Sequence, residues 1–329
     1  MSTKSQEPPT RNKSVLRSIA FYLLLPVTLL LLLLLLPLLW LRWESSLPRE
    51  DWFSERQGRI EKVDTEQATL DGGQLAEAVQ LVSDTGLTVS FRVIRRADPG
   101  TKLPVLLVLG GHRTGKDAVN LFGDVDGRAI VGMDYPYDGP DKVRGFMATA
   151  KTIPLARRAI LDTAPAVSLL VDWLMTQTWV DRDRIIVVGA SLGVPFAAAA
   201  AAREPRIDGA ILVHGAADNR LWLEVQVARR IDNELLHYPL SVLLNWIAYG
   251  PVYDTPRYVA MISPRPVVIV GATEDERTPA GQAELLFNSA GDPKRCLLYT
   301  SPSPRDFSCN LVCRLRLEKG GGGGGGGGG

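Results

Sequence analysis

A serine lies in the sequence where a buried strand gives way to a helix. Residues 185–193 are Ile-Ile-Val-Val-Gly-Ala-Ser-Leu-Gly, and the alanine-rich segment 196–202 follows. A strand, a sharp turn and a helix around a central serine form a nucleophile elbow, which presents the hydroxyl for attack on a carbonyl carbon. Gly189 and Gly193 suit this turn because its backbone passes too close to its neighbours for side chains. We therefore predict that Ser191 is a nucleophile rather than an idle residue in a small-residue turn.

A second glycine-rich segment follows an earlier apolar run. Residues 110–117 are Gly-Gly-His-Arg-Thr-Gly-Lys-Asp. In a serine hydrolase, a loop at this place supplies one amide of the oxyanion hole, and the residue after the nucleophile supplies the other. The backbone amides of His112 and Leu192 are the predicted donors. Gly110 and Gly111 would let the loop approach the reacting carbonyl closely.

The same segment nearly matches a phosphate-binding loop, in which GxxxxGK is followed by serine or threonine. Asp117 occupies the position of the hydroxyl residue that would bind magnesium, and its negative charge would oppose a bound phosphate. A nucleotide site would also leave the elbow at Ser191 unexplained. The oxyanion loop is therefore the preferred interpretation.

A carboxylate that could orient a catalytic histidine follows a late apolar strand. Residues 267–279 are Val-Val-Ile-Val-Gly-Ala-Thr-Glu-Asp-Glu-Arg-Thr-Pro. Asp275 is the predicted acid, because a carboxylate in this loop can fix the histidine tautomer and stabilise the imidazolium. Glu274 and Glu276 are interpreted either as neighbours whose side chains point in the wrong direction for the histidine or as solvated charges. Asp218 is the second candidate for the acid.

The base that would accept the serine proton is harder to find. The chain contains three histidines, His112, His214 and His237, and all of them precede Asp275. In hydrolases of this architecture the order along the chain is serine, acid, histidine. His214 is interpreted as structural or pocket-lining. No histidine in the sequence is therefore assigned as the base.

The C-terminal residues offer an explanation for the missing base. Residues 296–306 are Cys-Leu-Leu-Tyr-Thr-Ser-Pro-Ser-Pro-Arg-Asp, which resembles the translation of a transposon-end adapter used in sequencing libraries. Residues 320–329 are ten glycines, as a run of G bases read past the end of a fragment would give. We predict that residues 296–329 are adapter read-through and lie outside the fold. A natural flexible tail would explain the glycines but not residues 296–306.

The elbow, the glycine-rich loop and the strand followed by Gly-x-x-x-Asp-x-x-x-Pro together resemble the α/β-hydrolase superfamily. The nearest branch is that of dienelactone hydrolase and the prolyl-oligopeptidase-like serine hydrolases, and the resemblance covers about residues 75–295. It implies an α/β-hydrolase fold, with Ser191 as nucleophile and Asp275 as acid. It places the histidine after one more strand, in the part that the adapter replaces. It implies no cofactor.

An uncharged apolar segment lies near the N-terminus. Residues 19–41 carry no charge and include eight consecutive leucines, and about 20 apolar residues cross the hydrocarbon core as a helix. A signal peptide would have a shorter apolar region that ends in small residues, whereas this one ends in Leu-Leu-Trp-Leu-Arg-Trp. We predict a single transmembrane helix, with the lipid bilayer as its partner, after a basic tail over residues 1–18. A small excess of positive charge before the helix favours a cytoplasmic N-terminus, which in a bacterium places the hydrolase domain in the periplasm.

The rest of the sequence alternates short apolar runs with helical patterns, which predicts a mostly parallel sheet with helices on both faces. Residues 42–74 are predicted to be a juxtamembrane linker, followed by one hydrolase domain over residues 75–295. Residues 217–263 form either a cap or a crossover helix with a long loop. Strands are predicted at residues 75–82, 87–95, 105–109, 129–133, 185–188, 209–213 and 267–270, and the long helix before the elbow at residues 153–176.

Charge and cysteine content exclude other classes of function. Four of the 37 basic residues and two of the 36 acidic residues lie beyond residue 295, so the remainder is nearly balanced. This balance predicts no nucleic-acid partner. All three cysteines, Cys296, Cys309 and Cys313, also lie beyond residue 295, which leaves neither a disulfide nor a cysteine metal site before it.

The sequence thus predicts a membrane-anchored serine hydrolase that cleaves small carboxylic esters through an acyl-enzyme. A serine exopeptidase or amidase of the same fold, acting on a peptide-like substrate, is the alternative among enzymes. A non-catalytic binding protein that keeps the α/β-hydrolase fold is the alternative outside them. Without its histidine, the 329-residue chain is predicted to be catalytically impaired.

Overall fold

The chain divides at Leu47 into two units. A computed structural model describes residues 11–111, 114–123, 125, 127–140, 142–272 and 278–299. The first unit contains the helix α1 (Arg11–Ser45), which continues through Pro26 and Pro37. From Leu24 to Ser45 this helix is apolar and long enough to cross a membrane, a property that anchors share with signal sequences.

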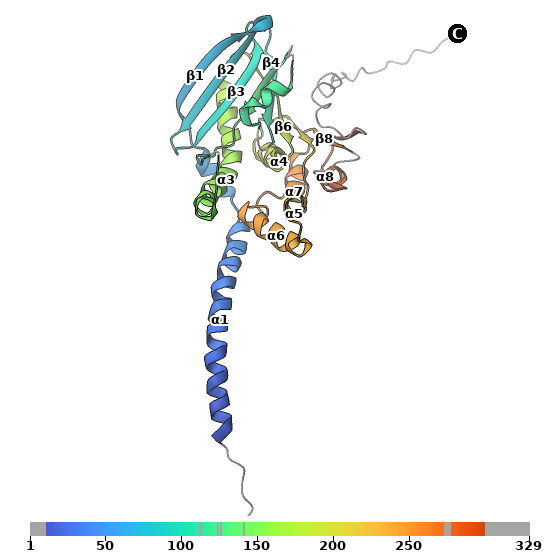
Figure 1. The fold of residues 1–329 in the computed structure, drawn as a ribbon. Helices are drawn as coiled ribbons and strands as arrows, with labels where there is room; N and C mark the ends of the chain where they lie inside the picture. Colours follow the sequence, from blue (N-terminus) through green and yellow to red (C-terminus); the bar gives the residue numbers. More distant parts are fainter. Residues whose placement is uncertain are drawn as a thin grey trace, which may run out of the picture. The chain divides into compact units, whose positions relative to one another are not determined.

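The second unit, which begins at Pro48, is built around one mixed sheet (Figure 1). Among the described residues, nine strands form this sheet in the order β1-β2-β3-β5-β4-β6-β7-β8-β9. The pairs from β1 to β5 are antiparallel, and the pairs from β5 to β9 are parallel. The strands are β1 (Ile60–Leu70), β2 (Gln74–Ser83), β3 (Thr88–Arg96), β4 (Leu103–Leu109), β5 (Ala129–Met133), β6 (Val180–Ala190), β7 (Gly209–Val213), β8 (Val267–Ala272) and β9 (Lys294–Tyr299).

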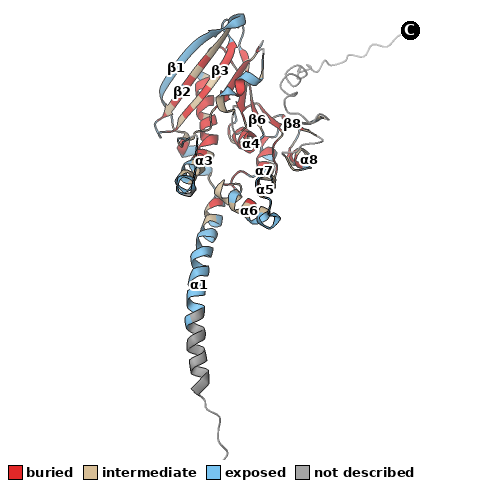
Figure 2. Ribbon diagram, in the orientation of Figure 1, coloured by how far each residue is buried: buried red, intermediate tan, exposed pale blue. Residues whose placement is uncertain are grey.

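The parallel part of the sheet forms the centre of the domain. Every residue of β5 and β7 is buried, which fits the continuous apolar runs of strands covered on both faces. In Figure 2 the strand β1, at the antiparallel edge, is exposed. The helices of the second unit are α2 (Glu50–Gln57), α3 (Phe146–Thr176), α4 (Gly193–Arg203), α5 (Asn219–Ala228), α6 (His237–Ile247), α7 (Thr255–Ile262) and α8 (Gln282–Ser289), with short 3₁₀ helices η1 (Asp71–Gly73), η2 (Gly115–Leu121) and η3 (Glu234–Leu236).

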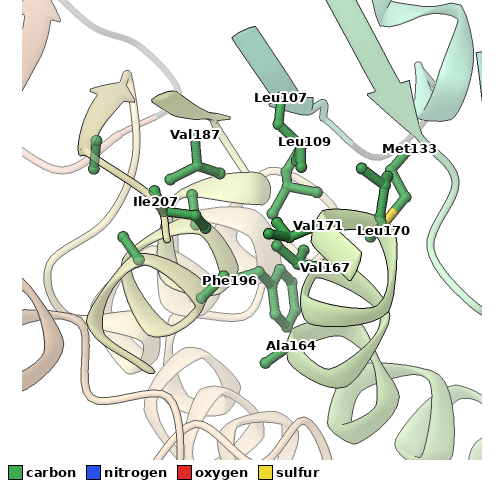
Figure 3. Close-up of a cluster of buried hydrophobic side chains, with 14 of the residues drawn as sticks. Leu107, Leu109, Met133, Ala164, Val167, Leu170, Val171, Val187, Phe196 and Ile207 are labelled. Carbon is green, nitrogen blue, oxygen red and sulfur yellow. The ribbon is translucent and has the colours of Figure 1, made fainter. Parts of the chain in front are cut away.

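The larger core lies where α3 and α4 pack on one face of the sheet. Leu107 and Leu109 of β4 contribute to it, with Val167 and Val171 of α3 and Phe196 of α4 (Figure 3). The helix α3 is apolar and long enough for a membrane span, but most of it is buried in this core. It is therefore a core helix of the domain.

A smaller core lies on the opposite face of the sheet. It joins Val108, Val188 and Val270 of the parallel strands to Ala118 and Val119 of η2. In the described part of the chain, η2 is the helix that contributes to this smaller core, and α2, α3, α4, α7 and α8 contribute to the larger one. The described residues therefore place α-helices on one face of the sheet and a short 3₁₀ helix on the other, which differs from the expectation of helices on both faces.

The segment between β7 and β8 has features of both predicted arrangements, the cap and the crossover helix. The last helix, α7, buries Tyr258, Val259 and Ile262 in the larger core, as a crossover helix does. Before it, α5, η3 and α6 form a helical insertion, the arrangement expected of a cap.

Several predicted boundaries differ from the observed elements, and α3, for example, begins at Phe146 rather than at residue 153. The strand before the elbow begins at Val180 rather than at Ile185, because exposed charged residues at its start interrupt the apolar pattern. Within residues 42–74, predicted as a linker, α2 packs on the domain and β1 pairs with β2. The charged sequence of β1 suits an exposed edge strand, whose pairing depends on backbone groups.

The strand β9 includes the first residues of the predicted adapter segment. Cys296 to Tyr299 pair in parallel with β8, and Leu298 is 59% exposed. Backbone pairing at a sheet edge needs no particular side chains, which is why these residues can extend β9 whatever their origin.

A buried ion pair attaches α2 to the core. The Nε and Nη2 atoms of Arg56 lie 3.0–3.1 Å from the carboxylate oxygens of Asp162 in α3, and the two side chains are 9% and 3% exposed. Arg56 also donates to the carbonyl oxygens of Thr85 and Gly86, in the turn between β2 and β3. This network joins α2, α3 and the β2–β3 hairpin.

The Asp162→Ala variant is expected to lower the free energy of unfolding by about 3–5 kcal/mol, because it leaves the Arg56 charge buried without its carboxylate. The matched control is Asp64→Ala, which breaks the exposed ion pair with Lys62 and should cost less than about 1 kcal/mol. Urea unfolding of the two variants and of the parent protein measures both effects. Equal losses in the two variants would contradict a structural role for the buried pair.

Candidate active site

Ser191 sits at the sharp turn between β6 and α4. Its φ of 53° is left-handed, a conformation that costs about 1–3 kcal/mol in a residue with a side chain and is concentrated at functional sites. Its amide donates to the carbonyl oxygen of Val213 at 2.8 Å, and its own carbonyl oxygen accepts from the amide of Val194 at 3.2 Å. Ser191 is exposed on the carboxyl edge of the sheet.

The two glycines of the elbow lie where side chains cannot fit. A Cβ on Gly189 would lie 2.6 Å from Cβ of Ala197 and 2.9 Å from Cα of Val194. A Cβ on Gly193 would lie 2.1 Å from the carbonyl oxygen of Leu109. The start of α4 therefore rests directly against the end of β4.

The loop after β4 passes beside the serine. β4 and β6 are parallel neighbours, with Leu109 opposite Gly189, so their carboxyl ends lie together. A Cβ placed on Gly111 would lie 3.9 Å from Cβ of Ser191. The two glycine-rich motifs, about 80 residues apart, are thus adjacent in space. His112, the predicted donor from this loop, lies outside the described residues.

Leu192, the other predicted oxyanion donor, is the N-cap residue of α4 and is half-buried. Amides at a helix N-terminus carry the positive end of the helix dipole. This position suits a group that stabilises negative charge next to Ser191.

Tyr135 was not identified from the sequence, yet it contacts the glycine-rich loop. Its hydroxyl donates to the carbonyl oxygen of Gly110 at 2.7 Å, and its ring meets Phe196 of α4 edge-on, with the centroids 5.5 Å apart. Burial raises the pKa of the Tyr135 hydroxyl far above its usual value, so the group remains a donor. The signal in the sequence that could have identified Tyr135 is its position just after β5, the strand beside β4.

The lysine of the phosphate-loop alternative is held by a carboxylate. The ammonium nitrogen of Lys116 lies 2.9 Å from Asp134 Oδ2, and the Lys116 amide donates to Asp134 Oδ1 at 2.8 Å. Asp117 pairs with Arg92 at 2.6 Å. These contacts fix the loop to β3 and to the end of β5. A phosphate bound by Lys116 would have to compete with the carboxylate of Asp134.

Of the four acidic residues considered for the catalytic acid, the structure describes Asp218 alone. Asp275, Glu274 and Glu276 lie outside the described residues. Asp218, the second candidate, is the N-cap of α5: its carboxylate accepts from the amide of Leu221 at 2.9 Å. This capping role explains why an aspartate stands at position 218 without any catalytic function.

The two described histidines differ in position. His214 follows β7 with a φ of 48°, and its carbonyl oxygen accepts from the hydroxyl of Thr278 at 3.2 Å. His237 begins α6, and its Nε2 lies 2.7 Å from the carbonyl oxygen of Ile231. Among the described residues, no group of three or more histidine, cysteine or acidic side chains is placed to hold a metal ion.

With this geometry established, comparison with known proteins shows what part of the chain is similar to. Residues 163–295, which include the elbow, match the model of the prolyl oligopeptidase family. This segment is therefore similar to the α/β-hydrolase domain of the prolyl oligopeptidase family. None of the curated proteins compared with the chain matches its sequence.

Solved structures show the same fold at low sequence identity. Acetyl xylan esterase 1 from Thermoanaerobacterium sp. JW/SL YS485 is similar with a TM-score of 0.56 and 17% identity, over 79% of this chain and 91% of the esterase. An acetyl xylan esterase from Paenibacillus sp. R4 gives 0.55 and 18%, over 76% and 86%. The 2,6-dihydroxy-pseudo-oxynicotine hydrolase gives 0.53 and 22%, over 74% and 65%. The α/β-hydrolase fold with a mostly parallel sheet is therefore established.

The Gly193→Ala variant is expected to lose about 1–3 kcal/mol of stability, because its methyl group would meet the carbonyl oxygen of Leu109. Gly111→Ala is the control, since the same methyl group would meet only Cβ of Ser191, at an ordinary contact distance of 3.9 Å. Thermal unfolding should show a melting temperature lowered by several degrees in the first variant alone. An unchanged melting temperature for Gly193→Ala would show that α4 can move away from β4 at little cost.

Proposed function

We propose that this hydrolase domain cleaves carboxylic esters with Ser191 as nucleophile and Asp275 as acid. The observation that carries the proposal is the left-handed backbone of Ser191 at the start of α4, beside Gly111 of the neighbouring loop. Such a turn projects the hydroxyl from the carboxyl edge of the sheet and places it near oxyanion donors. The acetyl xylan esterases of similar fold support an ester rather than another acyl substrate.

The proposed reaction is that of a serine hydrolase. The Ser191 hydroxyl attacks the ester carbonyl carbon while a histidine accepts its proton, and Asp275 stabilises the imidazolium. The amides of Leu192 and His112 stabilise the negative oxygen of the tetrahedral intermediate, each by about 3 kcal/mol. The alcohol leaves with the proton from the histidine. Water then attacks the acyl-enzyme by the same steps and releases the acid.

We further propose that the natural protein supplies this histidine beyond residue 295. Two observations support the proposal besides the resemblance of residues 296–306 to adapter sequence. The match to the family ends at residue 295, where the adapter-like segment begins. The smaller core is also thinly covered by the described residues, since Leu106, Ile186, Val268 and Leu297 there are only partly buried. A further helix after β9 would cover these side chains.

A peptidase or amidase activity is the alternative that the family match favours, because the family takes its name from an oligopeptidase. Both reactions use the same nucleophile and oxyanion donors, and they differ in the leaving group. Parallel assays with an ester and an anilide of the same acyl group would distinguish the two activities.

We also propose that α1 anchors the domain in a membrane rather than acting as a cleaved signal sequence. Its apolar part has no small-residue cleavage site, and it carries Trp40 and Trp43 near its C-terminal end, where interfacial aromatic residues belong. Leucines 29–36 are all at least half exposed, as lipid contact requires. In a bacterium, the charge distribution would place the hydrolase domain in the periplasm.

The missing base can be tested by replacing residues 296–329 with the continuation found in genomic DNA. Hydrolysis of p-nitrophenyl acetate should then be at least about 10³-fold faster than with the 329-residue chain. The Ser191→Ala variant of each protein is the control: it should remove the gain in the completed protein and should change the rate of the 329-residue chain little. Ester turnover by the 329-residue chain that Ser191→Ala abolishes would instead identify another residue as the base.

The anchor can be tested by washing membranes at alkaline pH. The full chain should stay in the pellet after carbonate extraction, because about 20 apolar residues hold a helix across the bilayer. A chain that starts at Glu44 is the control and should be released. Release of the full chain, or N-terminal sequencing that shows loss of α1, would contradict anchoring.

A further inference from the structure

Two consecutive residues after β5, Asp134 and Tyr135, hold the glycine-rich loop that follows β4. The Tyr135 hydroxyl donates to the carbonyl oxygen of Gly110 at 2.7 Å, where the loop begins. Asp134 accepts from the amide of Lys116 at 2.8 Å and pairs with its ammonium nitrogen at 2.9 Å, near the end of the loop. The amide of Asp134 donates in turn to the carbonyl oxygen of Ser90 in β3 at 2.9 Å. The loop is therefore attached to the sheet at two points.

The loop also lies in close contact with β5 and with itself. A Cβ on Gly132 of β5 would lie 2.5 Å from the carbonyl oxygen of Lys116. A Cβ on Gly110 would lie 2.0 Å from Oγ1 of Thr114. Neither side chain could be added without moving the loop, so its backbone has little room to change position.

Hydrogen bonds also fix the direction of the peptide groups in this loop. A peptide group is planar, so a bond to its carbonyl oxygen orients the amide of the next residue as well. The bond from Tyr135 therefore orients the amide of Gly111, the residue beside Ser191. The carbonyl oxygen of Gly111 accepts from both the amide and the hydroxyl of Thr114, at 3.2 and 3.1 Å. Two successive peptide groups next to the nucleophile are thus held by their carbonyl oxygens.

The ring of Tyr135 connects the loop to α4, the helix that follows the nucleophile. It meets the ring of Phe196 edge-on, with the centroids 5.5 Å apart. Burial raises the pKa of Tyr135 far above its usual value, so the hydroxyl keeps its proton at neutral pH. Because that single hydrogen is donated to Gly110, the hydroxyl has none left to donate to a substrate oxygen.

We propose that Tyr135 is a positioning residue for oxyanion stabilisation in the hydrolase reaction. The proposal rests on the proposed function, in which the amides of Leu192 and His112 bind the negative oxygen of the tetrahedral intermediate. Such donors are effective because they already point to the place where the charge develops, so that no reorganisation is needed during the reaction. Tyr135 supplies this preorganisation through the backbone of the loop rather than by contact with the substrate.

A purely structural role for the Tyr135 hydroxyl is the alternative, and Tyr253 provides the matched comparison. The ring of Tyr253 also meets Phe196 edge-on, with the centroids 4.7 Å apart. Its hydroxyl also donates to a backbone carbonyl oxygen, that of Ile160 in α3, at 2.5 Å. Loss of either hydroxyl leaves a carbonyl oxygen without its donor and lowers stability. The two tyrosines differ in that one holds the loop beside Ser191 and the other holds a core helix.

The test compares Tyr135→Phe with Tyr253→Phe in the protein completed with the continuation found in genomic DNA. Both substitutions keep the aromatic ring and its contact with Phe196. Hydrolysis of p-nitrophenyl acetate over a range of substrate concentrations separates kcat from KM. Tyr135→Phe should lower kcat at least about tenfold and leave KM within about twofold, because the interaction it weakens is made in the transition state. Tyr253→Phe should keep both constants within about twofold.

Thermal unfolding of the same variants measures the structural cost, and kcat is compared well below both melting temperatures. A loss of kcat in both variants, in proportion to their loss of melting temperature, would show a structural role and overturn the proposal. Unchanged kcat in Tyr135→Phe, or a rise in KM alone, would also overturn it, while turnover that Ser191→Ala abolishes in the parent protein would leave the proposed function intact. A parent protein without such turnover would overturn both.

Discussion

The close approach of α4 to the end of β4 determines the geometry of the candidate site. The carbonyl oxygen of Leu109 occupies the space that a side chain at residue 193 would need. Because β4 and β6 are parallel neighbours, the same approach brings Gly111 beside Ser191. Strand pairing on one side of the turn and helix packing on the other hold Ser191 in its left-handed conformation, which an isolated turn would relax.

A line of aromatic rings connects this site to α2. Phe196, in the second turn of α4, meets Tyr135 and Tyr253 edge-on, with centroid distances of 5.5 and 4.7 Å. Tyr253 in turn meets Phe53 of α2 at 6.2 Å. Such contacts are directional and add about 0.5–1.5 kcal/mol each beyond the burial of their area. The helix α2 is thereby part of the hydrolase domain.

Features encoded in contiguous sequence could be predicted without a structure. The elbow at Ser191 is local, because strand, turn and helix follow one another within about 20 residues. The apolar helix before Ser45 follows from a single uninterrupted run. The strands β5 and β7 have the predicted bounds, since their every residue is apolar or glycine and is buried. In each case the signal is the periodicity of a short segment, which local propensity and burial together determine.

Other features depend on contacts between distant segments, and only the tertiary structure decided them. The hydrogen bond from Tyr135 to Gly110 joins two loops whose sequences carry no mutual signal. The charged strand β1 has no apolar alternation, and it enters the sheet because β2 offers an open edge. Sequence alone therefore determined that Ser191 stands at an elbow, whereas three-dimensional packing decided which residues support it, because side chains far apart in the chain become neighbours only when the sheet assembles.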